Sequence, residues 1–199
     1  MTKILLATRN AAKLVELRRL LEGQGIEVLG LADVAEFPEA PETGATFAEN
    51  ALAKARDAAA ATGLPAVADD SGLAVDALGG MPGVLSARWC GRHGSDEENL
   101  QLVLGQLQDV PDERRGAKFV CAAALVVPGG KEVVVHGEWP GRLARAPRGT
   151  NGFGYDPIFV PEGEERTSAE MSPQEKDAAS HRGRAMRALL PHLTALAGG

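Results

Sequence analysis

The apolar and polar positions along the chain alternate between the patterns of buried strands and amphipathic helices. The apolar run in 3–8 predicts a strand, and leucines at 14, 17, 20 and 21 predict a helix from about residue 12. Further strands are expected at 26–29, 65–68, 119–127, 131–139 and 158–160. Early strand–helix alternation, a hairpin around Pro128-Gly129-Gly130 and helices at the end predict an α/β fold with a mixed sheet.

Three further helices are predicted by their start signals. In a capping box, a Ser or Thr and a Glu three residues later satisfy free backbone N–H groups at the helix end. Such pairs predict helices over 46–62, over 95 to about 108, and over 172 to about 196 with a break near residue 180. The pairs are Thr46 with Glu49, Ser95 with Glu98, and Ser172 with Glu175.

Length and charge narrow the class of protein. The 199 residues fit one domain, 1–199, of two lobes whose boundary is not readable from the sequence. The net charge of −6 argues against a nucleic-acid partner, which needs clustered Lys and Arg. No apolar run approaches the roughly 20 residues that cross a bilayer, so no membrane partner is expected. Cys90 and Cys121 form no disulfide framework, which favours a reducing cytoplasm.

The first candidate for chemistry lies at the junction of the first strand and helix. The free N–H groups and partial positive charge of a helix N-terminus attract phosphate. Thr8 and Asn10 add neutral donors, and Arg9 and Lys13 add charge. The alternative interpretation is an ordinary helix start with solvated basic residues.

Two adjacent acidic residues are the strongest candidates for metal binding and catalysis. Asp69 and Asp70 follow the strand predicted over 65–68, and in a regular strand they would point to opposite faces. Mg²⁺ prefers one or two carboxylates together with phosphate oxygens and waters, and a carboxylate beside a metal can activate an attacking water. Asn50 and Lys54 share one face of the preceding helix. The alternatives are a turn held by the Asp side chains and a solvated helix face.

Two later segments have the composition of a base-binding site. In 149–157, Phe153 stands between glycines, which suits a stacking platform with bare backbone beside it. Lys176 could meet a phosphate, and His181 with Arg182 could donate to acceptor atoms. The alternatives are a loop whose aromatic residues fill the core and a solvated helix.

Together and in this order, the segments closely resemble the Ham1/RdgB family of inosine/xanthosine triphosphate pyrophosphatases. The resemblance runs from Lys3 to about Leu190. It is carried by Phe47-Ala48-Glu49-Asn50-Ala51 through Lys54-Ala55, Ala68-Asp69-Asp70-Ser71-Gly72-Leu73, Pro82-Gly83 through Ser86-Ala87-Arg88, Gly152-Phe153-Gly154-Tyr155-Asp156-Pro157 and Ser180-His181-Arg182-Gly183.

The resemblance implies an elongated mixed sheet flanked by helices, with two lobes, an active-site cleft between them and a homodimeric assembly. The implied reaction is Mg²⁺-dependent hydrolysis of dITP, ITP or XTP to the monophosphate and pyrophosphate. Asp70 would bind the metal and accept the proton of the attacking water, and Ser71 would contact the substrate. The triphosphate would be bound by Thr8, Arg9, Asn10, Ala11, Ala12 and Lys13, with Lys54 and Lys176 neutralising charge. The base would be held by Phe153, Gly154, Tyr155 and Asp156, with His181 and Arg182 at its carbonyl edge.

The chain departs from the family pattern at two positions. Arg9 stands where members commonly have glycine, and Pro41 stands where they often have an acidic metal ligand. Glu42 is the nearest substitute as second ligand, and Glu39 is another. Two alternative functions are a Maf-type pyrophosphatase for modified pyrimidine nucleotides, which is thought to share the fold, and a non-catalytic nucleotide-binding protein.

Overall fold

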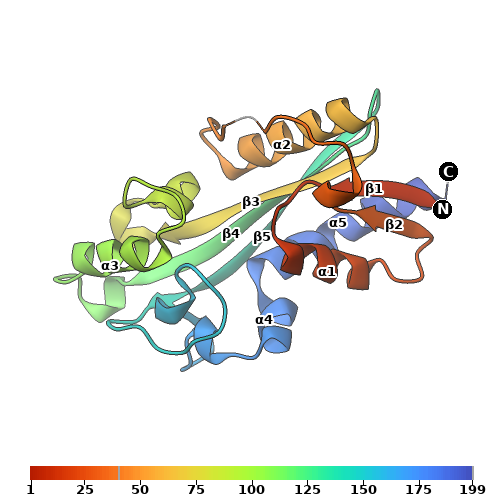
Figure 1. The fold of residues 1–199 in the computed structure, drawn as a ribbon. Helices are drawn as coiled ribbons and strands as arrows, with labels where there is room; N and C mark the ends of the chain where they lie inside the picture. The colour runs from red at the N-terminus through yellow and green to blue at the C-terminus, as the bar shows by residue number, and fades with distance from the viewer. Residues whose placement is uncertain (40, 199) are drawn as a thin grey trace. The chain divides into compact units, whose positions relative to one another are not determined.

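A computed structural model describes residues 1–39 and 41–198, with the side chains of Ala12 and Glu16 also outside the description. Figure 1 shows strands and helices mixed along the chain, and the predicted α/β class is confirmed. The strands are β1 (Thr2–Leu6), β2 (Ile26–Leu29), β3 (Ala66–Val75), β4 (Gly116–Val126), β5 (Glu132–Leu143) and β6 (Phe159–Pro161). The helices are α1 (Ala11–Leu20), α2 (Phe47–Thr62), α3 (Asp96–Gln106), α4 (Pro173–Ala179) and α5 (His181–Ala197).

The six strands form one mixed sheet in the order β2-β1-β3-β4-β5-β6. β1 pairs in parallel with β2 and β3, whereas β5 and β6 are antiparallel. The predicted turn joins β4 to β5, and the N–H of Val127 donates to the carbonyl of Lys131 at 2.9 Å. No helix within 1–39 and 41–198 is long and apolar enough to cross a membrane.

The chain divides into two compact units. The first unit consists of Met1–Asp70, Ala122–His136 and Ala185–Gly199. Its core packs alanines of α2 against β1, β3 and β4, which lets the helix backbone approach the strands closely. The members of this core are Leu5, Ala51, Ala55, Ala58, Ala59, Ala66, Ala68, Ala122, Ala124 and Val126.

The second unit consists of Ser71–Cys121 and Gly137–Arg184, and it has a separate core of larger side chains. The ring of Phe159 contacts those of Phe119 and Trp139, with centroids 4.5 and 5.4 Å apart. Tilted and edge-on arrangements of this kind add to the stabilisation from burial alone. The aromatic core supports β6 and the loop that precedes it.

The third strand is longer than predicted. We expected a strand over 65–68 that ends at the acidic pair, but β3 continues to Val75 and carries Asp69 and Asp70 in its middle. The strand continues because cationic or amide side chains contact both carboxylates, which offsets the cost of burying them.

Two of the predicted capping boxes differ in detail. Thr46 caps α2, but the Glu49 carboxylate accepts from the N–H of Ala45 and not from that of Thr46. The helix predicted from residue 95 is present as α3, but its predicted capping box was wrong. Arg92 donates to Ser95 Oγ and to Glu98, the two side chains that would form the box. The third capping box, at α4, is confirmed, and so is the break between α4 and α5 at Ser180.

Candidate active site

Strand β3 presents its two adjacent carboxylates to two different helices of the first unit. Asp69 Oδ2 accepts from the Nζ of Lys13, in the first turn of α1, at 2.7 Å. Asp70 Oδ2 accepts from the Nδ2 of Asn50, in α2, at 3.1 Å. The alternation of side chains along a strand therefore separates the pair, as the sequence predicted, and each carboxylate has its own partners.

Lys54 lies between two carboxylates. Its Nζ is 2.8 Å from Glu42 Oε1 and 3.4 Å from Asp70 Oδ1. Burial lowers the pKa of Lys54, but the charges of Asp70 and Glu42 outweigh burial and the pKa is raised. Lys54 therefore stays protonated. We call Glu42, Asn50, Lys54 and Asp70 the acidic cluster.

The carboxyl group of Asp70 is held in an environment that disfavours its charge. Burial raises the pKa of Asp70, and the nearby charge of Glu42 adds to this effect. Lys54 and the hydrogen bond from Asn50 act in the opposite direction without cancelling it. Because the charge of Asp70 is not fully compensated, the cluster would be stabilised by a further cation.

The chemistry of the acidic cluster fits a divalent cation. Glu42 and Asp70 offer carboxylate oxygens that already converge on one ammonium group. One or two carboxylates are what Mg²⁺ typically takes from a protein, with phosphates and waters completing the shell. Among residues 1–39 and 41–198, no three His, Cys, Asp or Glu side chains form a metal-binding group by themselves.

Asn50 organises the acidic cluster through both atoms of its amide group. Its Oδ1 accepts from the N–H of Gly44 at 2.8 Å while its Nδ2 donates to Asp70. A Cβ at Gly44 would lie 2.6 Å from that Oδ1, so glycine is required for this approach. The spacing of four residues between Asn50 and Lys54 predicts that both lie on one face of α2, whereas the contact of Asn50 with Asp70 was not predicted.

The predicted phosphate-binding segment forms the loop before α1 and its first turn. Thr8 Oγ1 accepts from the N–H of Asn10 at 3.2 Å, and Asn10 Oδ1 accepts from the N–H of Lys13 at 3.4 Å. The exposed Arg9 pairs with Glu39 at 3.0 Å. Ala11 begins the helix, and the side chain of Ala12 lies outside the described part of the chain. The first turn of α1 contains no acidic residue that would repel an anion.

The second unit carries a separate cluster around Asp156. This buried carboxylate accepts from the N–H of Phe153 at 2.9 Å, from the Ser168 hydroxyl at 2.7 Å and from the Nζ of Lys176. A Cβ on Gly152 would overlap Oδ2 of Asp156, and Gly152 has a φ of 75°. Only glycine therefore suits this position. We call Phe153, Asp156, Lys176 and Arg182 the aromatic cluster.

Phe153 is displayed at the surface of the second unit. Its side chain is large and apolar, yet the residue is 56 % exposed. The Nζ of Lys176 lies 5.1 Å and the Cζ of Arg182 lies 6.0 Å from the ring centroid, within the range of cation–π contacts. An exposed ring held beside two cations can stack on a planar ligand.

Two other predicted residues of the second unit are Tyr155 and Ser71. The Tyr155 hydroxyl donates to the carbonyl of Ser86 at 2.7 Å, and Tyr155 is buried. Ser86 Oγ also accepts from the N–H of Leu73 at 2.9 Å, so it links β3 to the loop of Tyr155. Ser71 is half-buried on β3 and is the first residue of the second unit.

His181 and Gly154 complete the predicted set. The ring of His181 is buried and stacks on that of Phe119, with centroids 4.9 Å apart and planes at 15°. The N–H of Gly154 donates to Asp96 Oδ2 at 3.0 Å, a contact that sequence reasoning missed. Nothing in the sequence marks Asp96 as different from the acidic residues that follow it in α3.

Comparison with known proteins identifies the family. A sequence model of the Ham1 family matches residues 4–192. A protein of Nocardia farcinica named dITP/XTP pyrophosphatase is 68 % identical over 200 residues, which cover 99 % of this chain and 97 % of that protein. The crystal structure of a Mycobacterium abscessus nucleoside-triphosphatase / dITP/XTP pyrophosphatase has a TM-score of 0.82 at 65 % identity, covering 96 % of this chain and 100 % of that one.

A more distant relative has the same fold. The structure of a HAM1 protein from Coxiella burnetii gives a TM-score of 0.91 at 47 % identity and covers 98 % of this chain and 99 % of that one. The match extends over nearly the whole length in each comparison, so no large part of the chain lies outside it. The chain belongs to the Ham1 family.

Proposed function

We propose that this protein hydrolyses dITP, ITP and XTP to the nucleoside monophosphate and pyrophosphate, and so keeps deaminated purines out of DNA and RNA. The names of its highly identical relatives from Nocardia and Mycobacterium support this substrate class. The homodimer and the cytoplasmic location expected from the sequence stay predictions.

The observation that carries the proposal is the convergence of Glu42, Lys54 and Asp70. Asp70 accepts the proton of the water that attacks the α-phosphorus, since its carboxylate is held in place by Asn50 and Lys54. Mg²⁺ would be held by Asp70 and Glu42 and would supply positive charge to the phosphate oxygens. Lys54, whose Nζ lies at both carboxylates, would neutralise charge on the phosphate oxygens beside them.

The hydrogen-bond donors and cations around the start of α1 bind the triphosphate. The N–H groups at the start of α1, the Thr8 and Asn10 side chains and Arg9 contact its oxygens. Lys13 extends from the same turn and is kept near β3 by Asp69. These contacts stabilise the negative charge that develops on the leaving pyrophosphate in the transition state.

The aromatic cluster binds the base. Phe153 stacks on the purine, and Arg182 with His181 donates to its O6 carbonyl. Adenine presents an amino group there, so a donor meets a second donor and is left unmatched, at a cost of about 1–3 kcal/mol. Lys176 neutralises negative charge of the nucleotide beside the ring.

The proposal is tested by replacing Asp70 with Asn. Asp70→Asn removes the proton acceptor with little change in volume, so turnover of dITP in the presence of Mg²⁺ should fall by at least about 1,000-fold while ITP still binds. Asp57→Asn, an exposed position on α2, is the matched control and should keep full activity. Substantial turnover by Asp70→Asn would mean that another group activates the water.

A further inference from the structure

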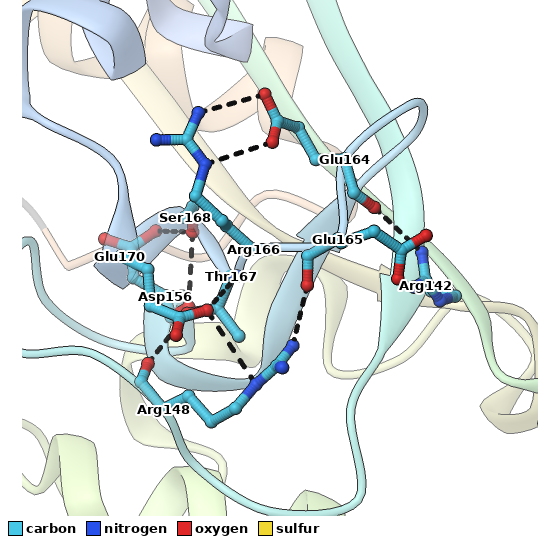
Figure 2. A network of polar contacts seen from close by, with 9 residues as sticks. All are labelled: Arg142, Arg148, Asp156, Glu164, Glu165, Arg166, Thr167, Ser168 and Glu170. Atoms are coloured by element: carbon cyan, nitrogen blue, oxygen red, sulfur yellow. Dashed lines mark hydrogen bonds and ion pairs between the residues drawn. The ribbon is translucent and has the colours of Figure 1, made fainter.

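The hydroxyl of Ser168 is directed at the carboxylate that organises the aromatic cluster. Ser168 Oγ donates to Asp156 Oδ1 at 2.7 Å, and Figure 2 shows the contact inside a larger polar network. Ser168 is completely buried and Asp156 is 2 % exposed. A hydrogen bond to a buried carboxylate is about twice as strong as one between neutral groups.

Asp156 joins three neighbouring segments, the loop of Phe153, the turn of Ser168 and helix α4. Its Oδ2 receives the N–H of Phe153 and the ammonium of Lys176, while Oδ1 receives Ser168. The orientation of this one carboxylate therefore decides where both the exposed ring and the lysine lie. A carboxylate can rotate about its own bond, and a donor on the opposite oxygen prevents this.

The backbone that carries Ser168 is itself fixed. The N–H of Thr167 donates to Glu170 Oε2 at 2.7 Å, and the Thr167 hydroxyl donates to the carbonyl of Arg148 at 2.7 Å. Figure 2 shows these contacts close to the hydrogen bond between Ser168 and Asp156, together with the ion pair of Arg148 and Glu170, which lie 3.8 Å apart. The Thr167 N–H thus fixes the backbone next to Ser168, whereas the Thr167 hydroxyl binds a different segment at Arg148.

We propose that Ser168 is a positioning residue for base recognition. It locks the Asp156 carboxylate, and through it the Phe153 ring and the Lys176 ammonium, in the arrangement that receives the purine. Ser168 itself touches no substrate. The inference rests on the proposed function and adds a residue that controls affinity for the base without taking part in the chemistry at the phosphate.

The variant Ser168→Ala tests the inference because it should change KM for dITP and leave kcat nearly unchanged. Loss of a donor to a buried carboxylate should raise KM for dITP about tenfold and leave kcat within about threefold, because the acidic cluster is unchanged. Inhibition by inosine monophosphate should weaken by the same factor. Inhibition by inorganic tripolyphosphate, which has no base, should not change.

Thr167→Val is the matched control. It removes the neighbouring hydroxyl, which is equally buried but bound to the Arg148 carbonyl and not to Asp156. We expect it to lower the melting temperature while KM for dITP stays within about twofold of wild type. Ser168→Cys keeps the volume and has only a weak S–H donor, so it should reproduce the KM increase even if Ser168→Ala folds poorly.

The possible results distinguish failure of the positioning role of Ser168 from failure of the proposed function. If wild type hydrolyses dITP and both Ser168 variants keep its KM, the positioning role is wrong and the proposed function stands. Equal KM increases in Thr167→Val and Ser168→Ala would also overturn the inference, because any loss of stability would then suffice. If wild type does not hydrolyse dITP, the proposed function fails, and calorimetric binding of inosine monophosphate by the same variants still decides the role of Ser168.

Discussion

The ammonium of Lys13 lies 2.7 Å from the carboxylate of Asp69, which joins the first turn of α1 to the strand that carries the proposed proton acceptor. The side chain of Asp69 is 1 % exposed and that of Lys13 is 15 % exposed. A charge buried to this degree is tolerated when an opposite charge contacts it. The contact thus places a lysine of the proposed phosphate-binding segment beside β3.

The first prediction concerns this ion pair. Lys13→Met removes the ammonium next to a buried carboxylate, and we expect a loss of about 3–5 kcal/mol in the free energy of unfolding. In the double variant Lys13→Met/Asp69→Asn, part of this stability should return because the charge is removed as well, whereas activity on dITP should stay low. Urea unfolding and pyrophosphate release measure the two effects. Recovery of activity together with stability would show that Lys13 serves folding alone.

The second prediction uses the raised pKa of Asp70. The folded state holds the proton of Asp70 more tightly than the unfolded chain, so stability falls as pH rises from the ordinary Asp pKa through the raised one. In metal-free buffer with EDTA at pH 8, Asp70→Asn should therefore be more stable than wild type. This difference should shrink as the pH is lowered towards 4. Guanidinium unfolding at several pH values measures it, and a pH-independent difference would contradict the assigned cause.

The third prediction concerns Gly152. Gly152→Ala combines a positive φ with overlap of its Cβ and the Asp156 carboxylate. We expect a loss of more than about 1–2 kcal/mol in stability and a higher KM for dITP. Gly163→Ala is the control, since Gly163 has a φ of 81° in the same unit but nothing within 4 Å of an added Cβ. If KM for dITP were unchanged in both variants, the Gly152 loop would have no role in base binding.

The fourth prediction concerns selectivity for the base. Arg182→Ala removes a donor beside Phe153, and the ratio of kcat/KM for ITP to that for ATP should fall by about tenfold or more. Most of the change should come from a lower kcat/KM for ITP. Steady-state rates on both nucleotides measure the ratio, and an unchanged value would refute a role for Arg182 in recognising the carbonyl edge.

The pattern of the sequence predicts most of the fold because the strands and helices have local signals. Apolar runs mark β1, β2, β4 and β5, and the caps of α2 and α4 are placed correctly. The extent of β3 could not be predicted. Adjacent aspartates disfavour a strand unless distant side chains compensate them, and contacts with Lys13 and Asn50 form only in the folded protein.

The candidate site is predictable in its residues and less so in their contacts. The spacing of Asn50 and Lys54 places both on one face of α2, as found. The capping box at Ser95 was not realised because Arg92, three residues earlier, competes for the same side chains. Ser168 has no sequence signal, since its effect depends on a carboxylate twelve residues earlier in the chain.

The most direct test of the central claim is pyrophosphate release from dITP, XTP, ITP, dGTP and ATP, measured side by side with and without Mg²⁺. We predict fast, metal-dependent release from the first three, slower release from dGTP, and release at least about tenfold slower from ATP, whose amino group leaves a donor unmatched. Equal rates on all five would keep the hydrolytic chemistry but contradict selection of deaminated purines. No release from any of them would contradict the pyrophosphatase itself.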